Sequence, residues 1–267
     1  MRRPLTFSCE GAALAATLDD PGGRIGLLLV TGGAQTRIGS HRMYERLAGS
    51  LAESGVCCLR FDRRGVGDSE GEDGGFRGSA ADIAAAVAAF RAESPSLGKL
   101  YGFGLCDGAS AIALFGDQAG LDGLVLVNPW LVEAEADAPP PAAIRSHYRR
   151  RLLSLDGWKK ILSGSVDYRK LLRGIAKIAR PAAEASLAAE IAEALARHRL
   201  PAHLLLATGD ATAVAAAAEV KAARFDGLIG ATTKLETDSH TFARPGDEAV
   251  LLAAALEALE GFGAQAS

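Results

Sequence analysis

The sequence predicts an α/β fold in which a mostly parallel central sheet is flanked by helices. Short apolar runs rich in Val, Ile and Leu alternate with Ala-rich segments of helical period, which is the pattern of a parallel sheet covered by helices. Hydrophobic residues make up 49% of the chain and charged residues 23%, so the chain can bury a large core and is not disordered. A length of 267 residues fits one such domain with an insertion.

The first half of the chain contains the opening elements of the predicted sheet. Residues 5–9 and 12–18 are predicted to form an antiparallel pair of strands at the sheet edge, followed by a turn at Pro21-Gly22-Gly23. Ser79 precedes a predicted helix, and its hydroxyl is of the type that caps helix N-termini. The other predicted elements are strands over 25–31, 56–61 and 99–103 and helices over 42–54 and 80–93.

The regular alternation of strand and helix stops after a predicted strand over 123–127. Residues 131–200 include Pro139-Pro140-Pro141 and several helical stretches, so we expect a helical lid inserted between core strands of a single domain over 1–267. The pattern then resumes, and the domain is completed by strands over 203–207 and 232–236 and helices over 213–223 and 248–262.

The most informative motif is Gly104-Leu105-Cys106-Asp107-Gly108, which stands between a predicted strand and a predicted helix. Its spacing is that of a nucleophile elbow, a strained turn that presents a nucleophile, with Cys in place of Ser. Small residues on both sides of the turn prevent a clash between strand and helix, and the helix N-terminus favours a thiolate. We therefore expect Cys106 to be the nucleophile. The alternative is a buried structural cysteine in a glycine-flanked turn.

Two further residues complete a predicted catalytic triad. His240 follows the last predicted strand and is expected to act as the general base, while Asp210 follows the strand before it. Cys106, Asp210 and His240 then follow one another in the order nucleophile, acid and histidine, which is the order found in folds with a nucleophile elbow. Asp210 either orients His240 or only caps the next helix, and Asp238 is a weaker candidate for the acid because it lies two residues from His240.

Backbone N–H groups after the strand over 25–31 are expected to stabilise an oxyanion. A glycine pair occurs there, in Thr31-Gly32-Gly33-Ala34-Gln35, and lets the backbone approach a developing negative charge. Gly33 or Ala34 is expected to supply one N–H group and Asp107 the second. The alternative is that the glycine pair forms only a tight turn.

Charge is distributed unevenly along the chain. The whole chain has a formal charge of −3, which argues against a nucleic-acid-binding protein. Residues 144–180 carry +9, which leaves −12 elsewhere. This asymmetry is compatible with an anionic substrate, with peripheral contact of the lid to an acidic membrane surface, or with a solvated helix face. Arg37, His41 and Arg42 either contact a carboxylate or phosphate or lie on a helix surface.

The cysteines and the apolar runs indicate the compartment. Cys9, Cys57, Cys58 and Cys106 form neither a disulfide framework nor a zinc-binding pattern. We expect a cytoplasmic protein that needs no metal ion or organic cofactor. No apolar run reaches the length of a transmembrane helix, and the amino terminus lacks a signal-peptide core. The oligomeric state is not predicted.

Several segments resemble a known superfamily. The loop after the strand over 56–61 resembles the D-x-R-G-x-G-x-S-x-G loop of the α/β hydrolases, and it reads Asp62-Arg63-Arg64-Gly65-Val66-Gly67-Asp68-Ser69-Glu70-Gly71. More narrowly, residues 32–42, 63–65 and Asn128-Pro129-Trp130 are similar to the exosortase A system-associated hydrolases (type 1), which accompany bacterial exosortase and exopolysaccharide loci. The resemblance implies a cytoplasmic bacterial α/β hydrolase. Cys106 departs from the usual serine, as in some relatives such as the dienelactone hydrolases.

The expected activity is hydrolysis of an ester or thioester through Cys106, His240 and Asp210, with a covalent acyl-enzyme. The substrate would be a small-molecule or carrier-linked acyl compound. Two alternatives stay open at this point. One is transfer of the acyl group to a saccharide hydroxyl through the same cysteine, and the other is a non-catalytic binding module that uses the basic lid as its contact surface.

Overall fold

The computed structural model describes residues 1–132 and 186–265, and these form one sheet with helices on both faces. The strands are β1 Arg2–Cys9, β2 Ala12–Asp19, β3 Ile25–Val30, β4 Cys57–Phe61, β5 Lys99–Leu105, β6 Leu124–Val127, β7 Ala202–Ala207 and β8 Ala231–Leu235. Their order is β1-β2-β4-β3-β5-β6-β7-β8. Pairs from β4 to β8 are parallel, whereas β1 and β2 form an antiparallel edge. The predicted sheet and its edge pair are confirmed.

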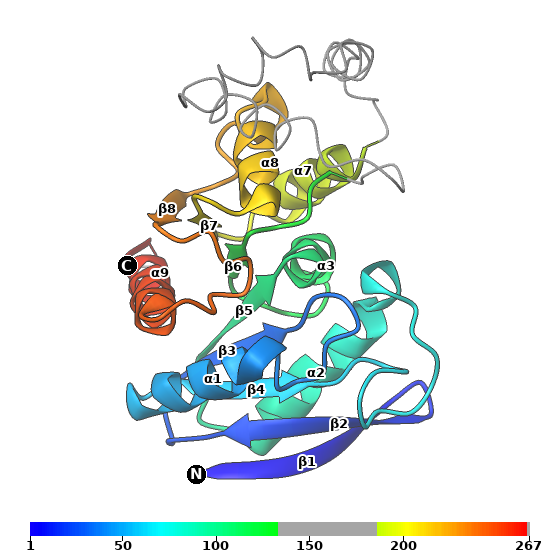
Figure 1. Cartoon of the computed structure of the whole chain (residues 1–267). Helices are drawn as coiled ribbons and strands as arrows, with labels where there is room; N and C mark the ends of the chain where they lie inside the picture. Colours follow the sequence, from blue (N-terminus) through cyan, green and yellow to red (C-terminus); the bar gives the residue numbers. More distant parts are fainter. Residues whose placement is uncertain (133–185, 266–267) are drawn as a thin grey trace, which may run out of the picture.

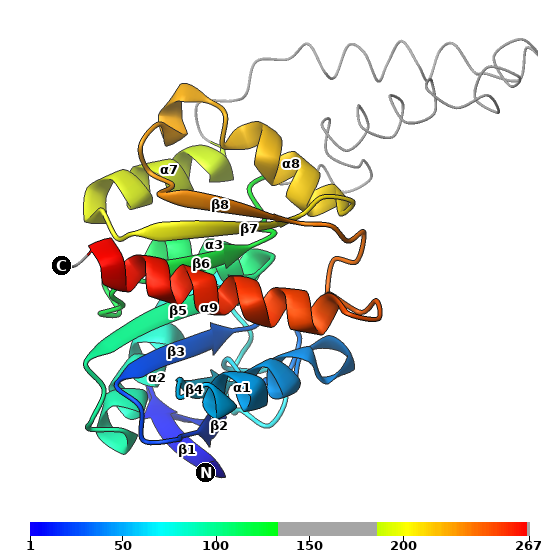
Figure 2. The same ribbon diagram turned by 90° about the vertical axis from the view of Figure 1, so that its left-hand side faces the viewer.

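Helices cover both faces of this sheet. They are α1 Met43–Glu53, α2 Ala80–Glu93, α3 Asp107–Phe115, α7 Leu187–His198, α8 Ala211–Glu219 and α9 Asp247–Gln265, with short 3-10 helices η1 Ser40–Arg42, η2 Phe76–Gly78 and η3 Ala223–Phe225. Helices α1 and α9 lie on one face, and α2, α3 and α7 lie on the other (Figure 1). Figure 2 looks onto the face that α1 and α9 cover. Within the described residues, no helix has the length and hydropathy to cross a membrane.

Burial explains why these segments form these elements. Strands β4, β6 and β7 are buried along their whole length, as expected for parallel strands that are covered on both faces. Helix α1 buries Tyr44, Leu47 and Leu51 at helical spacing. The Tyr44 hydroxyl donates to the Val30 carbonyl at 3.0 Å and accepts the Leu105 N–H at 3.1 Å. Helix α1 is thereby fixed to the carboxyl ends of β3 and β5, where the candidate site lies.

The predicted helix start at Ser79 is correct, but its predicted cap is wrong. Ser79 precedes α2, yet its side chain makes no capping hydrogen bond. Its hydroxyl donates to the Phe76 carbonyl at 2.6 Å. Ser79 has φ −87° and ψ 2° and not the extended backbone of a capping residue, because η2 ends directly before it.

Most of the predicted lid over 131–200 lies outside the described residues, and so does the basic segment over 144–180. The last part of that range is helix α7, which is capped by Ser186 and buries Leu187, Ile191 and Leu195. Helix α7 packs against α3 and leads into β7. This part of the range therefore covers the core sheet.

Candidate active site

Cys106 stands at a sharp turn between β5 and α3. Its backbone has φ 60° and ψ −127°, a conformation that L residues rarely adopt and that strains the chain. A methyl group on Gly104 would lie 2.5 Å from the Ala109 nitrogen, and one on Gly108 would collide with the Val30 carbonyl. The turn therefore requires glycine on both sides, and it points Cys106 to the carboxyl ends of the strands, as the motif predicts.

His240 lies in the loop between β8 and α9, and Asp210 follows β7. The Nδ1 atom of His240 is 2.9 Å from Oδ2 of Asp210. The same oxygen accepts the Ala213 N–H at 2.9 Å and caps α8. One oxygen atom thus contacts both the His240 ring and the amino end of α8. Asp238 instead pairs with Arg244, at 3.0 and 3.1 Å, on the exposed side of the loop.

The surroundings of His240 favour its protonated form. Hydrogen bonding to Asp210 and then to Cys106 raises the pKa of His240 to about 10, although partial burial acts in the opposite direction. An imidazole placed between a carboxylate and a sulfur atom can exchange protons with the sulfur. The helix N-terminus of α3 adds partial positive charge next to Cys106. The structure thus brings Cys106, His240 and Asp210 together.

The predicted oxyanion donors are only partly available. The Gly33 N–H donates to Oδ1 of the Asp107 side chain at 2.6 Å. Ala34 is exposed and does not line the cavity that contains Cys106. The Asp107 N–H begins α3 and has no partner among the described residues. The buried Arg63 side chain donates to the Gly33 carbonyl and so helps to fix this loop.

A cavity of about 280 Å³ surrounds the sulfur atom at the carboxyl ends of the strands. Its walls are Gly32, Gly33, Gln35, Phe76, Leu105, Cys106, Asp107, Trp130 and His240. A larger cavity of about 710 Å³, which includes Lys99 and Ala202, opens at the amino ends of β5 and β7. We place the site in the smaller cavity because it holds the paired cysteine and histidine.

Other polar residues that the sequence singled out have structural partners. Arg37 pairs with the buried Asp62 and with Asp68, and Arg42 pairs with Glu45 at 2.6 and 2.8 Å. The Nε2 atom of His41 lies 2.8 Å from the Thr241 carbonyl. These contacts favour the surface interpretation of Arg37, His41 and Arg42 over an anion site.

Comparison with known proteins identifies the family of this chain. The model of a family described as "Serine aminopeptidase, S33" matches residues 28–224, which is more than half of the chain. The chain belongs to this hydrolase family. Among curated proteins, none matches the chain.

Several solved structures resemble this serine aminopeptidase family member. An esterase from Pyrococcus furiosus is 14% identical, with 97% of this chain and 90% of that chain covered and a TM-score of 0.66. A dienelactone hydrolase from Anabaena variabilis is 13% identical, with coverage of 98% and 97% and a TM-score of 0.61. A thioesterase domain from the curacin biosynthetic pathway is 13% identical, with coverage of 96% and 99% and a TM-score of 0.59. Likeness at these identities concerns the fold, which is that of the α/β hydrolases.

Asn128 and Trp130 are site residues of this family member whose contacts the sequence did not predict. The Asn128 side chain accepts the Ala207 N–H at 2.9 Å and donates to the His240 carbonyl at 3.2 Å. The backbone N–H of Trp130 donates to the Cys106 carbonyl at 3.1 Å, and Trp130 lines the cavity. The sequence held one signal for these contacts. Asn128 directly follows an apolar strand, and an amide buried at that position needs hydrogen-bond partners.

Proposed function

We propose that this hydrolase cleaves a short-chain ester or thioester through a covalent intermediate on Cys106. The observation that carries the proposal is the position of Cys106 on a strained turn next to His240, whose other ring nitrogen is 2.9 Å from Asp210. A nucleophile, a base and a group that orients the base are the parts that acyl transfer requires.

In the first half-reaction, His240 holds the proton of Cys106, and the sulfur attacks the acyl carbon. The carbon–sulfur bond forms as the carbonyl becomes an oxyanion, which accepts a hydrogen bond from the Asp107 N–H. The Gly33 N–H is bound to the Asp107 side chain at 2.6 Å. Collapse of this intermediate breaks the bond to the leaving oxygen or sulfur, which takes the proton from His240. Water then attacks the acyl-enzyme with His240 as base, releases the carboxylic acid and restores the thiol.

Supporting arguments come from the charges around Cys106. A histidine with a raised pKa next to the sulfur supplies a positive charge that stabilises negative charge on the attacking atom. The esterase, dienelactone hydrolase and thioesterase structures have the same fold, and their names describe acyl chemistry. Phe76, Leu105 and Trp130 make the cavity mostly apolar, which favours a short acyl chain.

We further propose a cytoplasmic location and a link to bacterial exosortase and exopolysaccharide systems. All four cysteines are free, which suits a reducing compartment, and segments such as 32–42 carry the resemblance to the exosortase-associated hydrolases. The predicted preference for anionic substrates rests on residues 144–180, outside the described residues. Cell fractionation with a tagged chain tests the location, and enrichment in the membrane or periplasmic fraction would contradict it.

Initial rates with p-nitrophenyl butyrate and butyryl-N-acetylcysteamine test the activity. We expect turnover by the wild type and a loss of about a thousandfold or more in Cys106→Ala and His240→Ala. Cys57→Ala removes a buried thiol away from the site and serves as the matched control, with turnover like the wild type. An alanine anilide probes the peptidase activity that the family's name describes. Turnover that persists in Cys106→Ala would overturn the proposal.

A further inference from the structure

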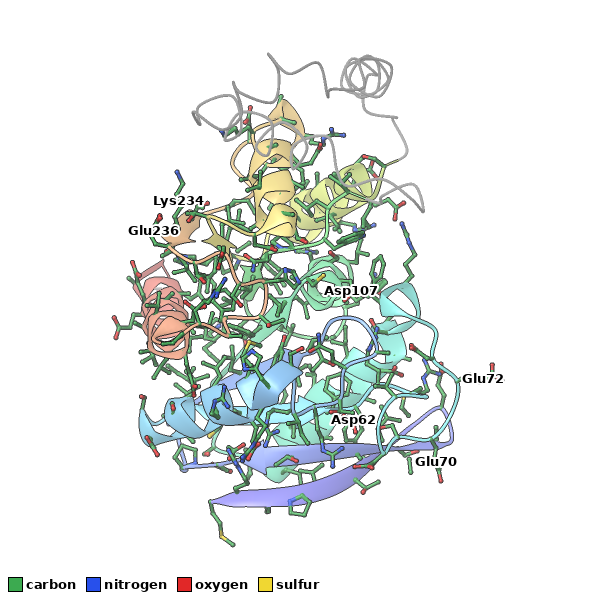
Figure 3. All side chains as sticks on the ribbon, viewed as in Figure 1. Asp62, Glu70, Glu72, Asp107, Lys234 and Glu236 are labelled. Carbon is green, nitrogen blue, oxygen red and sulfur yellow. The ribbon has the colours of Figure 1, made fainter. Side chains whose placement is uncertain are left out.

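We infer that Asp107 is a specificity-determining residue whose carboxylate makes the acyl site discriminate against negatively charged acyl groups. The inference rests on the proposed function, because it assigns a substrate class to the same site. Asp107 follows the nucleophile directly, and its side chain lines the cavity that contains Cys106 and His240. Figure 3 labels Asp107 beside α3 near the middle of the view, whereas Glu236 and Glu70 are labelled toward its edges.

The position of the carboxylate is fixed from two sides. Oδ1 of Asp107 accepts the Gly33 N–H at 2.6 Å, and the Asp107 backbone forms the first residue of α3. The carboxylate also packs closely against Gly32, because a methyl group on Gly32 would lie only 2.6 Å from the same Oδ1 atom. The same methyl group would lie 3.2 Å from Cβ of Cys106, so the carboxylate and the nucleophile flank one glycine.

The charge of Asp107 has no cationic side chain paired with it among the described residues. The Arg63 guanidinium donates to the Gly33 carbonyl, and His240, which lines the same cavity, pairs with Asp210 at 2.9 Å. A carboxylate with no ion-pair partner in a partly closed cavity repels a second negative charge more strongly than an exposed one does. It attracts a positive charge for the same reason.

Three acyl thioesters of similar size measure this effect. β-Alanyl-, butyryl- and malonyl-N-acetylcysteamine end in a positive, a neutral and a negative group, and each rate is corrected for hydrolysis without enzyme. For the wild type we expect kcat/KM to fall in that order, with about a hundredfold between the first and the last. We expect the ratio to shrink by about tenfold in Asp107→Asn, which keeps an acceptor for the Gly33 N–H.

Two controls isolate the local charge. Asp117→Asn removes one negative charge from the turn two residues after α3, which is itself about 12 Å long, and should leave the ratio unchanged. Asp107→Glu keeps the charge and should retain the order. The inference fails if the wild type shows no charge order, or if Asp107→Asn and Asp117→Asn give the same ratio as the wild type.

Alkylation of Cys106 tests the inference without turnover. Iodoacetamide and iodoacetate have the same size and differ by one negative charge, and the other three cysteines are buried. Relative to the iodoacetamide rate, we expect the iodoacetate rate to rise about tenfold in Asp107→Asn. An unchanged ratio would overturn the inference. Failure of the proposed function is a separate result, because it would appear as absent butyryl turnover with the alkylation ratio still shifted.

Discussion

The side-chain amide of Asn128 donates to the backbone carbonyl of His240 at 3.2 Å, although the two residues are 112 positions apart in the chain. The other end of the same side chain accepts the Ala207 N–H at 2.9 Å, three residues before Asp210. Asn128 is completely buried and has a φ of 41°. Its amide has both a donor and an acceptor, so one side chain links the strand that carries the acid to the loop that carries the base.

Replacing Asn128 with Leu tests this link. Leu has a similar volume but leaves a buried N–H and a buried carbonyl without a partner, which costs about 1–3 kcal/mol of unfolding free energy. We also expect kcat to fall about tenfold or more as the His240 loop loses its support, measured by urea unfolding and steady-state kinetics. Ser94→Ala removes a buried hydrogen bond away from the site and should lower stability only. An Asn128→Leu variant with normal kcat would contradict the link.

Two substitutions separate the roles of Asp210. Asp210→Asn keeps an oxygen that can cap α8 but removes the charge facing His240, whereas Asp210→Ala removes both. We expect both variants to lose about 10²- to 10⁴-fold in kcat/KM. Only Asp210→Ala should lose about 1 kcal/mol more of stability through the missing cap. Equal stability of the two variants would mean that the cap contributes nothing.

The raised pKa of His240 predicts a pH-dependent stability. The pKa is about 10 in the folded protein against 6.5 for the free side chain, so the folded state binds the proton more tightly. The stabilisation is therefore fully present below about pH 6.5 and is lost as the pH rises through about 10. The difference in Tm between wild type and His240→Gln should shrink from pH 6 to pH 10.

His203 provides a control of opposite sign for this measurement. Burial lowers the pKa of His203, so its folded form disfavours the proton and destabilises the protein at acidic pH. The Tm of wild type relative to His203→Gln should therefore fall as the pH drops below about 6.5. A wild-type advantage over His240→Gln that grows toward pH 10 would show that the pKa of His240 is not raised.

The nucleophile turn predicts a strong penalty at Gly108. A methyl group there collides with backbone atoms of Val30 and Thr31, and the strand cannot move away without breaking the sheet. We expect Gly108→Ala to lose about 3 kcal/mol or more, measured by urea unfolding. Gly78 has open space around it, so Gly78→Ala should change stability by less than about 1 kcal/mol. Similar values for the two variants would contradict the close packing of the turn.

Local pattern was enough to predict most of the fold. Strands β1 to β8 and helices α1, α2, α8 and α9 lie within a few residues of the predicted ranges, because apolar runs and glycine turns are local features. The cap at Ser79 was wrong because a 3-10 turn that the pattern did not predict ends directly before Ser79 and holds its backbone at φ −87° and ψ 2°.

The spacing of motifs in the sequence predicted the part of the site that consists of the elbow and the residues that follow strands. The elbow and the order of Cys106, Asp210 and His240 have fixed positions in the chain, and the structure brings these residues together. The contact of the Asp107 side chain with Gly33 was not predictable, because it joins residues 74 positions apart. The contact between Asn128 and His240 was hidden for the same reason.

The most direct test of covalent catalysis by Cys106 is rapid-quench intact-mass spectrometry with butyryl-N-acetylcysteamine. We predict that wild type gains the mass of one butyryl group during turnover, that peptide mapping places it on Cys106, and that Cys106→Ala gains none. His240→Ala should form the adduct slowly. Turnover without an adduct on Cys106, or the same adduct on Cys106→Ala, would contradict the account.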